Sequence, residues 1–179
     1  MTERSIELAV ADRFLVEKGR EVVEIGAVTP YYWPLRVTTI IDPADPHPDV
    51  TDRCSWEDWS VDGRPILSIS TFEHMGTGEY GLIAKTSAQD ALAKLLASPA
   101  DFLISFPPGY NSTFDECVAA AELTAHGVVG LGWERGVHGN GWQETNLAEL
   151  LASSPAYGAT GATALAMLIR TPSLDWLSR

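Results

Sequence analysis

A single glycine and two acidic residues stand at the ends of two apolar segments near the start of the chain. Gly26 follows a first segment that contains Glu24, and Asp42 ends a second segment over residues 36–41. A turn after a first strand lets the backbone approach a ligand, and an acid after the second strand can accept hydrogen bonds from two ribose hydroxyls. These residues, with Ala27 in the turn, predict a site for a ribose-bearing ligand.

Each of these residues also has an ordinary structural explanation. A lone glycine, here followed by Ala27 rather than by a second glycine, is common where a strand meets a loop. Aspartate before proline, as at Asp42, often begins a turn. Glu24 favours a functional site over these structural explanations, because a carboxylate in an apolar strand is costly unless it is hydrogen bonded. Glu24 would then organise the turn or reach an amino group of the ligand.

A second group of polar residues follows the apolar segment over residues 65–69. Ser70 and Thr71 end that segment, and Glu73 and His74 come directly after them. Ligands of open parallel sheets bind at the carboxyl ends of the strands. Histidine titrates near neutral pH, so His74 is a candidate general base, with a brace for the loop as the structural alternative. The glycine-rich segment that follows, with Tyr80, is a candidate lid.

Aromatic residues mark two further segments. Ser55 and Trp56 begin a run rich in tryptophan and acid, which suits a wall for a purine; simple packing of the rings is the alternative. Tyr110 and Asn111 follow an apolar segment over residues 101–106. They would orient a substrate in the same crevice, or form a rigid turn in which Asn111 caps a helix.

The composition limits the partners of the protein. The chain has 179 residues, of which 45% are hydrophobic, and a net charge of −12 without any block of lysine or arginine. This length predicts one domain over residues 1–179. The negative charge disfavours nucleic acid and anionic membrane surfaces as partners. It suits a neutral or cationic small molecule as substrate, or it serves only to keep the protein soluble. The tryptophan-rich loops favour self-association into a homo-oligomer.

The cysteines and histidines do not predict a metal site. Cys54 and Cys117 lie far apart, which implies neither a disulfide framework nor zinc, and the histidines show no ligand spacing. The first residues lack the apolar core of a signal peptide, and no apolar run is long enough to cross a membrane. A cytoplasmic location is therefore the expectation.

Helices and strands alternate along the chain. Hydrophobic spacing predicts helices over 5–18, 87–97, 112–123 and 146–153, and strands over 21–25, 36–41, 64–71, 101–106, 126–133 and 163–169, with a short strand over 50–56. This alternation is typical of an α/β fold in three layers, with a mostly parallel sheet covered on both faces. The second crossover is shortened, because three prolines between residues 43 and 48 disfavour a helix there.

The chain resembles class I S-adenosylmethionine-dependent methyltransferases over residues 6–169. More narrowly, it is similar to small methyltransferase-domain proteins that carry three motifs in this order. The motifs stand here as Val22-Val23-Glu24-Ile25-Gly26-Ala27-Val28 with Tyr31-Tyr32, as Ser68-Ile69-Ser70-Thr71-Phe72-Glu73-His74-Met75-Gly76, and as Pro107-Pro108-Gly109-Tyr110-Asn111 with Asp115. The resemblance implies a Rossmann-like sheet whose last strand is antiparallel.

The resemblance also implies a role for each matching residue. Glu24 and Gly26 would lie at the amino-acid end of the cofactor, with Ala27 also among the cofactor-binding residues, and Asp42 would lie at the ribose. Ser55 and Trp56 would lie near adenine, and Ser70 and Thr71 under the sulfonium. Glu73 and His74 would face the substrate. The chain departs from the pattern because it lacks a Gly-x-Gly turn, a helix after the second strand and an added substrate domain. A partner subunit that completes the substrate pocket would account for the short chain.

The main hypothesis is therefore S-adenosylmethionine-dependent methyl transfer to a small molecule. His74 is the candidate base, and Tyr80 and Tyr110 are candidate positioning groups. One alternative is a methyltransferase-like binding or regulatory module that lacks catalysis. Another is a nicotinamide-dependent oxidoreductase, which the single-glycine turn disfavours. The spacing also disfavours it, because Glu24 and Asp42 lie closer to Gly26 than the acid of a nicotinamide site would.

Overall fold

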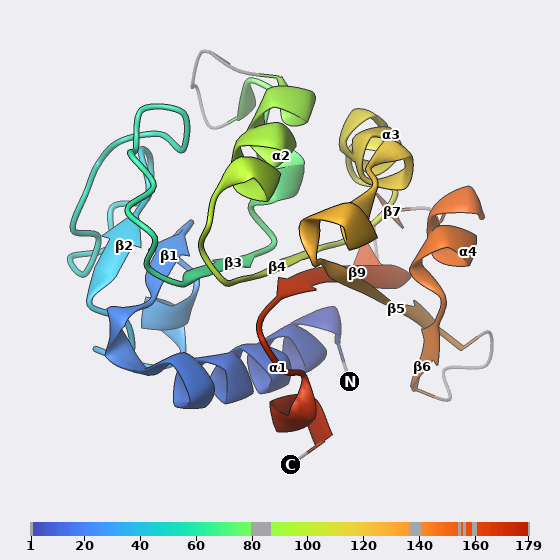
Figure 1. The fold of residues 1–179 in the computed structure, drawn as a ribbon, viewed down its shortest axis with the longest axis horizontal. Helices are drawn as coiled ribbons and strands as arrows, with labels where there is room; N and C mark the ends of the chain where they lie inside the picture. The colour runs from blue at the N-terminus through green and yellow to red at the C-terminus, as the bar shows by residue number, and fades with distance from the viewer. Residues whose placement is uncertain are drawn as a thin grey trace.

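The sheet at the centre of the protein contains strands from both halves of the chain. The computed structural model describes residues 2–79, 87–136, 141–153, 155, 157–158 and 161–178. The strands of the sheet are β1 (Val23–Ile25), β2 (Thr39–Ile41), β3 (Ile66–Ile69), β4 (Phe102–Phe106), β5 (Val129–Arg135), β6 (Trp142–Thr145) and β9 (Ala164–Arg170). Their order across the sheet is β2-β1-β3-β4-β9-β5-β6 (Figure 1).

The sheet is mixed, with most strands running in the same direction. β2, β1, β3 and β4 pair in parallel, with Val23 opposite Thr39 and Ile66 opposite Phe102. β9 lies between β4 and β5 and is antiparallel to both, and β6 is antiparallel to β5. This arrangement is an α/β fold, as the sequence predicts. A separate hairpin joins β7 (Tyr157–Gly158) to β8 (Gly161–Ala162).

Helices cover both faces of the sheet. α1 (Glu3–Lys18) lies on one face with the short helix η6 (Asp175–Ser178), and α2 (Ala88–Ala97), α3 (Ser112–Ala120) and α4 (Leu147–Ala152) lie on the other (Figure 1). Each face has its own apolar core. Phe14 of α1 packs with Leu67 and Met167 on the first face, and Leu95 of α2 packs with Ile104 on the second. The three layers thus agree with the predicted architecture.

Side-chain caps fix where several helices begin. Ser87 Oγ accepts the amide of Asp90 at 3.1 Å, and Asn111 Oδ1 accepts the amide of Phe114 at 3.1 Å. An N-cap of this kind satisfies an amide that the first turn leaves without a partner. The cap at Asn111 is the structural alternative that the sequence left open for this residue. Because α3 follows β4 in the chain, this cap also fixes the loop that leaves the carboxyl end of β4.

Some predicted elements are shorter than expected or wrong. Residues 50–56 do not form a strand; only Asp52 makes a β-bridge, to Ile41. The predicted strand over 36–41 begins at Thr39, and α3 ends at Ala120 rather than at residue 123. The structure adds β6, which the sequence did not predict. As expected for the shortened crossover, residues 42–65 contain no helix.

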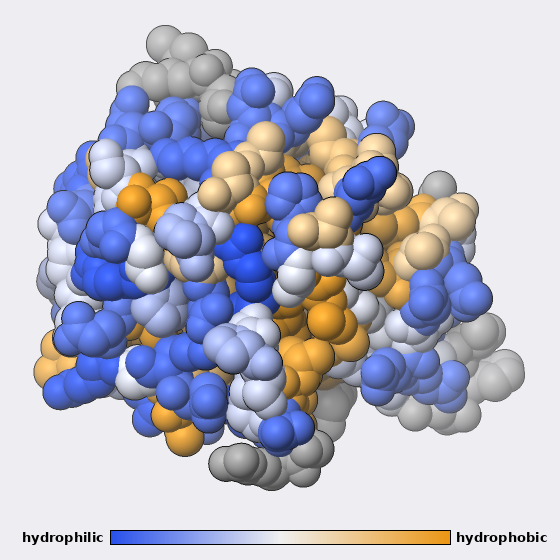
Figure 2. All heavy atoms as spheres, in the orientation of Figure 1, coloured by the Kyte–Doolittle hydropathy of each residue, from blue (hydrophilic) through white to orange (hydrophobic). Residues whose placement is uncertain are grey.

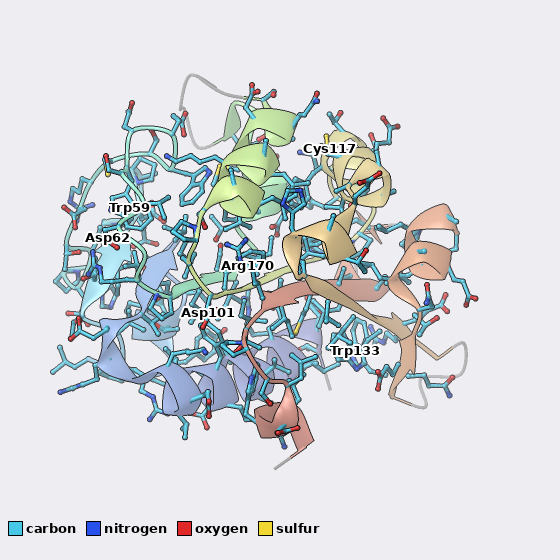
Figure 3. The ribbon with its side chains drawn as sticks, in the orientation of Figure 1. Trp59, Asp62, Asp101, Cys117, Trp133 and Arg170 are labelled. Atoms are coloured by element: carbon cyan, nitrogen blue, oxygen red, sulfur yellow. The ribbon has the colours of Figure 1, made fainter. Side chains whose placement is uncertain are left out.

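Arg170 ties the end of β9 to the chain that links α2 and β4. Its guanidinium donates to the carbonyl oxygens of Leu96, Ser98 and Ala100 and lies 4.7 Å from the ring centre of Phe102 (Figure 3). Lys18 at the end of α1 pairs with Asp101 at 2.7 Å just before β4. These contacts lie at the edge of the sheet opposite the carboxyl ends of its parallel strands.

The face of the molecule seen in Figure 2 has a polar and an apolar region. In Figure 2, hydrophilic side chains cover most of the face near α1 and β2, and hydrophobic side chains gather near α3, β9 and β5. Within the described ranges, the helices are too short or too polar to cross a membrane.

Candidate functional site

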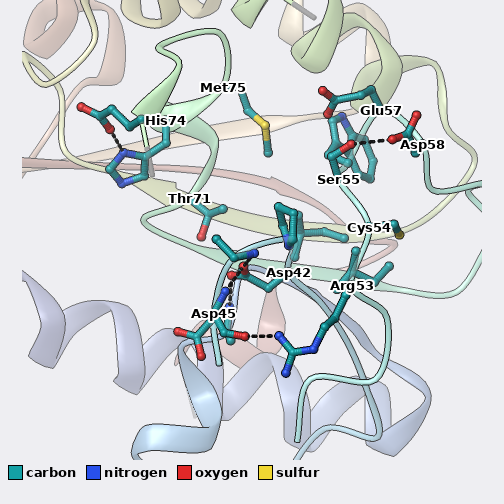
Figure 4. Close-up of a pocket in the computed structure, with 18 of the residues that line it drawn as sticks. Asp42, Asp45, Arg53, Cys54, Ser55, Glu57, Asp58, Thr71, His74 and Met75 are labelled. Atoms are coloured by element: carbon teal, nitrogen blue, oxygen red, sulfur yellow. Dashed lines mark hydrogen bonds and ion pairs between the residues drawn. The ribbon is translucent and has the colours of Figure 1, made fainter. Parts of the chain in front are cut away.

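A cavity of about 770 Å³ opens at the carboxyl ends of β1, β2 and β3. Its size lies within the range of 300–1,000 Å³ typical of small-molecule and cofactor sites. Of the residues that the sequence predicted for the site, Gly26, Ala27, Asp42, Ser55, Trp56, Ser70, Thr71 and His74 line this cavity. Residues from four separate segments thus meet at one edge of the sheet (Figure 4).

The turn after β1 brings the backbone close to the cavity floor. Gly26 has a φ of +85°, in the left-handed region, and its amide donates to the Ile41 carbonyl at 2.9 Å. A Cβ atom at this position would lie 2.1 Å from Thr71 Oγ1 and 2.9 Å from Thr71 Cβ. Both the backbone conformation and the close approach of Thr71 require glycine here.

Glu24 holds this turn from inside the protein. Its carboxylate is fully buried and accepts the amides of Val28 at 3.0 Å and Thr29 at 2.7 Å, together with the Thr29 hydroxyl. Burial raises the pKa of Glu24 to about 7 against these hydrogen bonds, which lower it, and Asp42 adds to the rise. Glu24 does not line the cavity, so its position supports the organising role rather than direct contact with a ligand.

Asp42 lies in the cavity wall directly after β2. Its Oδ2 accepts the amide of Ala27 at 3.1 Å, and its Oδ1 accepts those of Ala44 and Asp45 at 2.8 Å each. A carboxylate offers roughly four acceptor positions. Asp42 therefore joins the first turn to the proline-rich loop and retains acceptor capacity for a ligand hydroxyl.

The tryptophan-rich loop forms the opposite wall. Trp56 is only 2% exposed and donates its indole N–H to the Ala91 carbonyl at 3.2 Å, so much of its ring belongs to the core. Ser55 donates to Asp58 at 3.0 Å at the cavity rim (Figure 4). The loop thus combines core packing, the alternative that the sequence left open, with a surface that faces the cavity.

Lys94 of α2 holds the tryptophan-rich loop in place, which the sequence did not predict. Its Nζ donates to the carbonyls of Trp56 at 2.6 Å, Glu57 at 3.2 Å and Trp59 at 2.6 Å, and it lies 4.6 Å from the centre of the Trp56 ring. Partial burial lowers the pKa of Lys94, and the carboxylates of Glu57 and Asp58 act in the opposite direction. One ammonium group thus orders three carbonyls of this loop.

A Lys94→Met variant is expected to lose about 2 kcal/mol of unfolding free energy, because hydrogen bonds to a charged donor contribute about 1.5–3 kcal/mol each and the freed carbonyls recover part of this from water. Chemical denaturation measures the loss. Lys18→Met is the matched control, since Lys18 makes a single ion pair, with Asp101, on the other side of the sheet. Equal amide exchange over residues 56–59 in both variants would contradict the role of Lys94.

His74 faces the cavity within a cluster of three polar side chains. Its Nδ1 lies 2.5 Å from Glu79 Oε2, and the Tyr110 hydroxyl donates to the same carboxylate at 2.9 Å. Figure 4 shows His74 in the cavity wall. The rings of His74 and Tyr110 pack edge to face, with centres 4.8 Å apart. The hydrogen bonds from His74 and Tyr110 lower the pKa of Glu79. A histidine oriented by a carboxylate is the usual form of a general base.

Glu79 is thus a site residue that the sequence analysis missed, and Tyr110 reaches the site through it. Tyr110 itself is not among the residues that line the cavity. Tyr80, the other predicted positioning group, lies outside the described residues.

Glu73 lies below the cavity rather than in its wall. It is 2% exposed, its Oε1 is 3.9 Å from His74 Nε2, and its Oε2 has no hydrogen-bond partner among the described residues. Burial raises the pKa of Glu73 well above its usual value, and the nearby carboxylate of Glu7 adds to the rise. The Glu73 carboxyl group therefore lies beside Nε2 of the His74 ring, where burial favours its protonated form.

In the wall of the cavity, most of the charged side chains are acidic. It contains the carboxylates of Asp42, Asp45, Glu57, Asp58 and Glu79 against the single guanidinium of Arg53. Arg53 donates to the backbone carbonyls of Asp45 and His47. A concave surface with an excess of one charge attracts ligands of the opposite sign, so this cavity favours a cation. Among the described residues, no group of three His, Cys, Asp or Glu side chains is placed to hold a metal ion.

No protein-family model matches the chain, and no curated protein is significantly similar to it. The assignment of a function therefore depends on the geometry of the cavity and on the sequence motifs.

Proposed function

We propose that the protein is an S-adenosylmethionine-dependent methyltransferase that acts on a small molecule. The observation that carries this proposal is the meeting of three predicted elements in one cavity: the Gly26 turn, the Asp42 carboxylate and the end of β3 at Ser70 and Thr71. A last strand, β9, that is antiparallel and inserted next to β4 also agrees with the sheet that the resemblance implies.

The residues of the cavity suit this cofactor. S-adenosylmethionine supplies an electrophilic methyl group on a sulfonium centre, and the acidic wall favours a ligand with this positive charge. Asp42 is placed to accept the ribose hydroxyls, because it ends β2 and keeps an acceptor position beside the three amides that it holds. The turn at Gly26 presents backbone to the cavity, where the resemblance puts the amino-acid end, and Thr71 fills the space that a side chain at this position would take.

The residues around His74 would serve the methyl acceptor. Methyl transfer requires mainly that donor and acceptor are held close together and that water is excluded. For a hydroxyl acceptor, Nε2 of His74 takes the proton while Glu79 holds the ring through Nδ1. Tyr110 positions Glu79.

Calorimetry with S-adenosylmethionine and S-adenosylhomocysteine tests the proposal, with NAD as the comparison ligand. We expect both adenosyl compounds to bind, and Asp42→Asn to weaken them about 10- to 100-fold, because a hydrogen bond to a charged group contributes about 1.5–3 kcal/mol. Thermal unfolding shows whether the variant remains folded.

The outcomes separate the candidate functions. No binding of either adenosyl compound would refute the methyltransferase proposal, and binding of NAD in their place would favour an oxidoreductase. Binding without transfer to any acceptor in a broad screen would favour a binding or regulatory module, the alternative that the single-glycine turn supports.

A further inference from the structure

A buried acidic residue of α1 lies under the candidate site, and the proposed chemistry does not use it. Glu7 is a carboxylate that is only 1% exposed, and its neighbours on the same side of the helix are the core residues Val10, Ala11 and Phe14. Burial of an ionised carboxylate in a core is strongly unfavourable unless it is paired and hydrogen bonded. Glu7 therefore occupies a position at which an apolar side chain would give a simpler core.

The partners of Glu7 lead directly to the cavity. Its Oε1 accepts the hydroxyl of Ser70 at 2.6 Å and that of Ser105 at 2.7 Å, and its Oε2 lies 3.1 Å from Arg4 Nη1. Ser105 is a polar residue of the otherwise apolar strand β4, and Ser70 follows β3 and lines the cavity. A single carboxylate thus fastens the ends of two neighbouring strands to α1.

Ser70 has the backbone conformation that needs such support. Its φ is +44°, a left-handed value that is unfavourable for residues other than glycine. Strained residues of this kind persist only where the surrounding structure fixes them, and they gather at functional sites. The Ser70 amide also donates to the Ser105 carbonyl at 3.0 Å, so the turn is held through both its backbone and its side chain.

This turn determines where the following residues lie. Thr71, the next residue, packs against Gly26 in the cavity floor, and His74 follows one helical turn later in η3 (Phe72–His74). A change in the backbone at Ser70 would therefore move both the floor of the proposed cofactor site and the candidate base.

We propose that Glu7 is a positioning residue of the site: by accepting the hydroxyls of Ser70 and Ser105, it holds the turn after β3 in its left-handed conformation and so places Thr71 and His74. The inference rests on the proposed function, because it gives Glu7 a role in binding the adenosyl ligand. Glu7 itself does not line the cavity.

The first part of the test needs no ligand. It measures amide hydrogen exchange of Ser70, with Ile66 as an internal reference, because the Ile66 amide donates to the Asp101 carbonyl at 2.9 Å at the other end of β3. We expect Glu7→Leu to speed exchange at Ser70 about tenfold more than at Ile66. Glu7→Gln keeps an acceptor oxygen for both serines and should retain near-normal exchange.

The second part is a double-mutant cycle with Ser70→Gly, which adopts a positive φ without strain. Glu7→Leu should weaken S-adenosylhomocysteine about tenfold when Ser70 is present and less than twofold when glycine replaces it. Three results would each overturn the inference. The first is an equal loss of ligand affinity in the Ser70 and Ser70→Gly backgrounds, and the second is an equal acceleration of amide exchange at Ser70 and Ile66. The third is a Glu7→Gln variant whose exchange and affinity change as much as those of Glu7→Leu. Failure of the unaltered protein to bind S-adenosylhomocysteine would instead refute the proposed function, and the exchange measurements would still decide whether Glu7 holds the turn.

Discussion

Replacement of Gly26 by alanine is expected to lower the free energy of unfolding by about 2–5 kcal/mol and to abolish binding of the adenosyl ligand. The left-handed backbone costs an alanine roughly 1–2 kcal/mol, and overpacking against a neighbour costs about 1–3 kcal/mol more. Rotation of the Thr71 side chain cannot remove the clash, since its own Cβ would be 2.9 Å from the new methyl group. Chemical denaturation and calorimetry measure the two losses.

Gly63 offers a matched control. Its φ is +86°, almost the same as that of Gly26, but a Cβ atom there would meet nothing within 4 Å. Gly63→Ala should therefore lose only the backbone contribution, about 1 kcal/mol, and bind ligand normally. Addition of Thr71→Gly to the Gly26→Ala variant should restore part of its stability. Equal destabilisation by the two alanine variants would show that contact with Thr71 does not determine the residue at position 26.

The second large effect concerns the pH dependence of stability, which Glu24→Gln is expected to reduce. The pKa of Glu24 is about 7 in the folded protein against a usual value of 4.5. Between these two values the folded state binds more protons than the unfolded state, so the free energy of unfolding falls as the pH rises through this window. The shift corresponds to a loss of about 3 kcal/mol from below pH 4.5 to above pH 7.

Glutamine stays neutral over this range and can still accept the amides of Val28 and Thr29. From pH 4.5 to pH 8, the parent protein should therefore lose about 3 kcal/mol of unfolding free energy relative to the Glu24→Gln variant. Denaturation at several pH values measures it. Glu144→Gln, which removes an exposed carboxylate from β6, controls for the loss of one negative charge. A difference that stays constant with pH, or moves in favour of the parent, would show that Glu24 is ionised throughout.

The sequence predicted the parts of the fold that depend on local signals. The apolar runs of β3 and β4 are continuous because both faces of the sheet are covered, and Ser87 and Asn111 mark the starts of two helices. β6 has no such signal, since the sequence Trp-Gln-Glu-Thr becomes a strand through its pairing with β5. The predicted strand over 50–56 is wrong for a related reason, because its pairing with β2 is limited to two residues. The amides of Thr51 and Asp52 donate to the Ile40 carbonyl, and the Asp52 carbonyl accepts the amide of Asp42.

The candidate site was predictable where a residue follows a strand directly. Gly26, Asp42 and Thr71 come at such ends, and parallel strands bring those ends together. Glu79 and Lys94 were missed because their contacts depend on how a loop and a helix pack, which no short motif encodes. Glu7 did leave a signal: it stands three, four and seven residues before Val10, Ala11 and Phe14, which places a carboxylate on the buried side of a helix.

The position of β9 has a consequence for how the molecule assembles during synthesis. β9 is the last strand of the sheet along the chain, yet it lies between β4 and β5 and pairs with one edge of each. Until residue 170 has left the ribosome, β4 and β5 each keep an open edge, and such edges are prone to pair with other chains. The nascent protein can therefore build the half of the sheet that carries the cavity, but joining it to the β5–β6 hairpin must wait for this late strand.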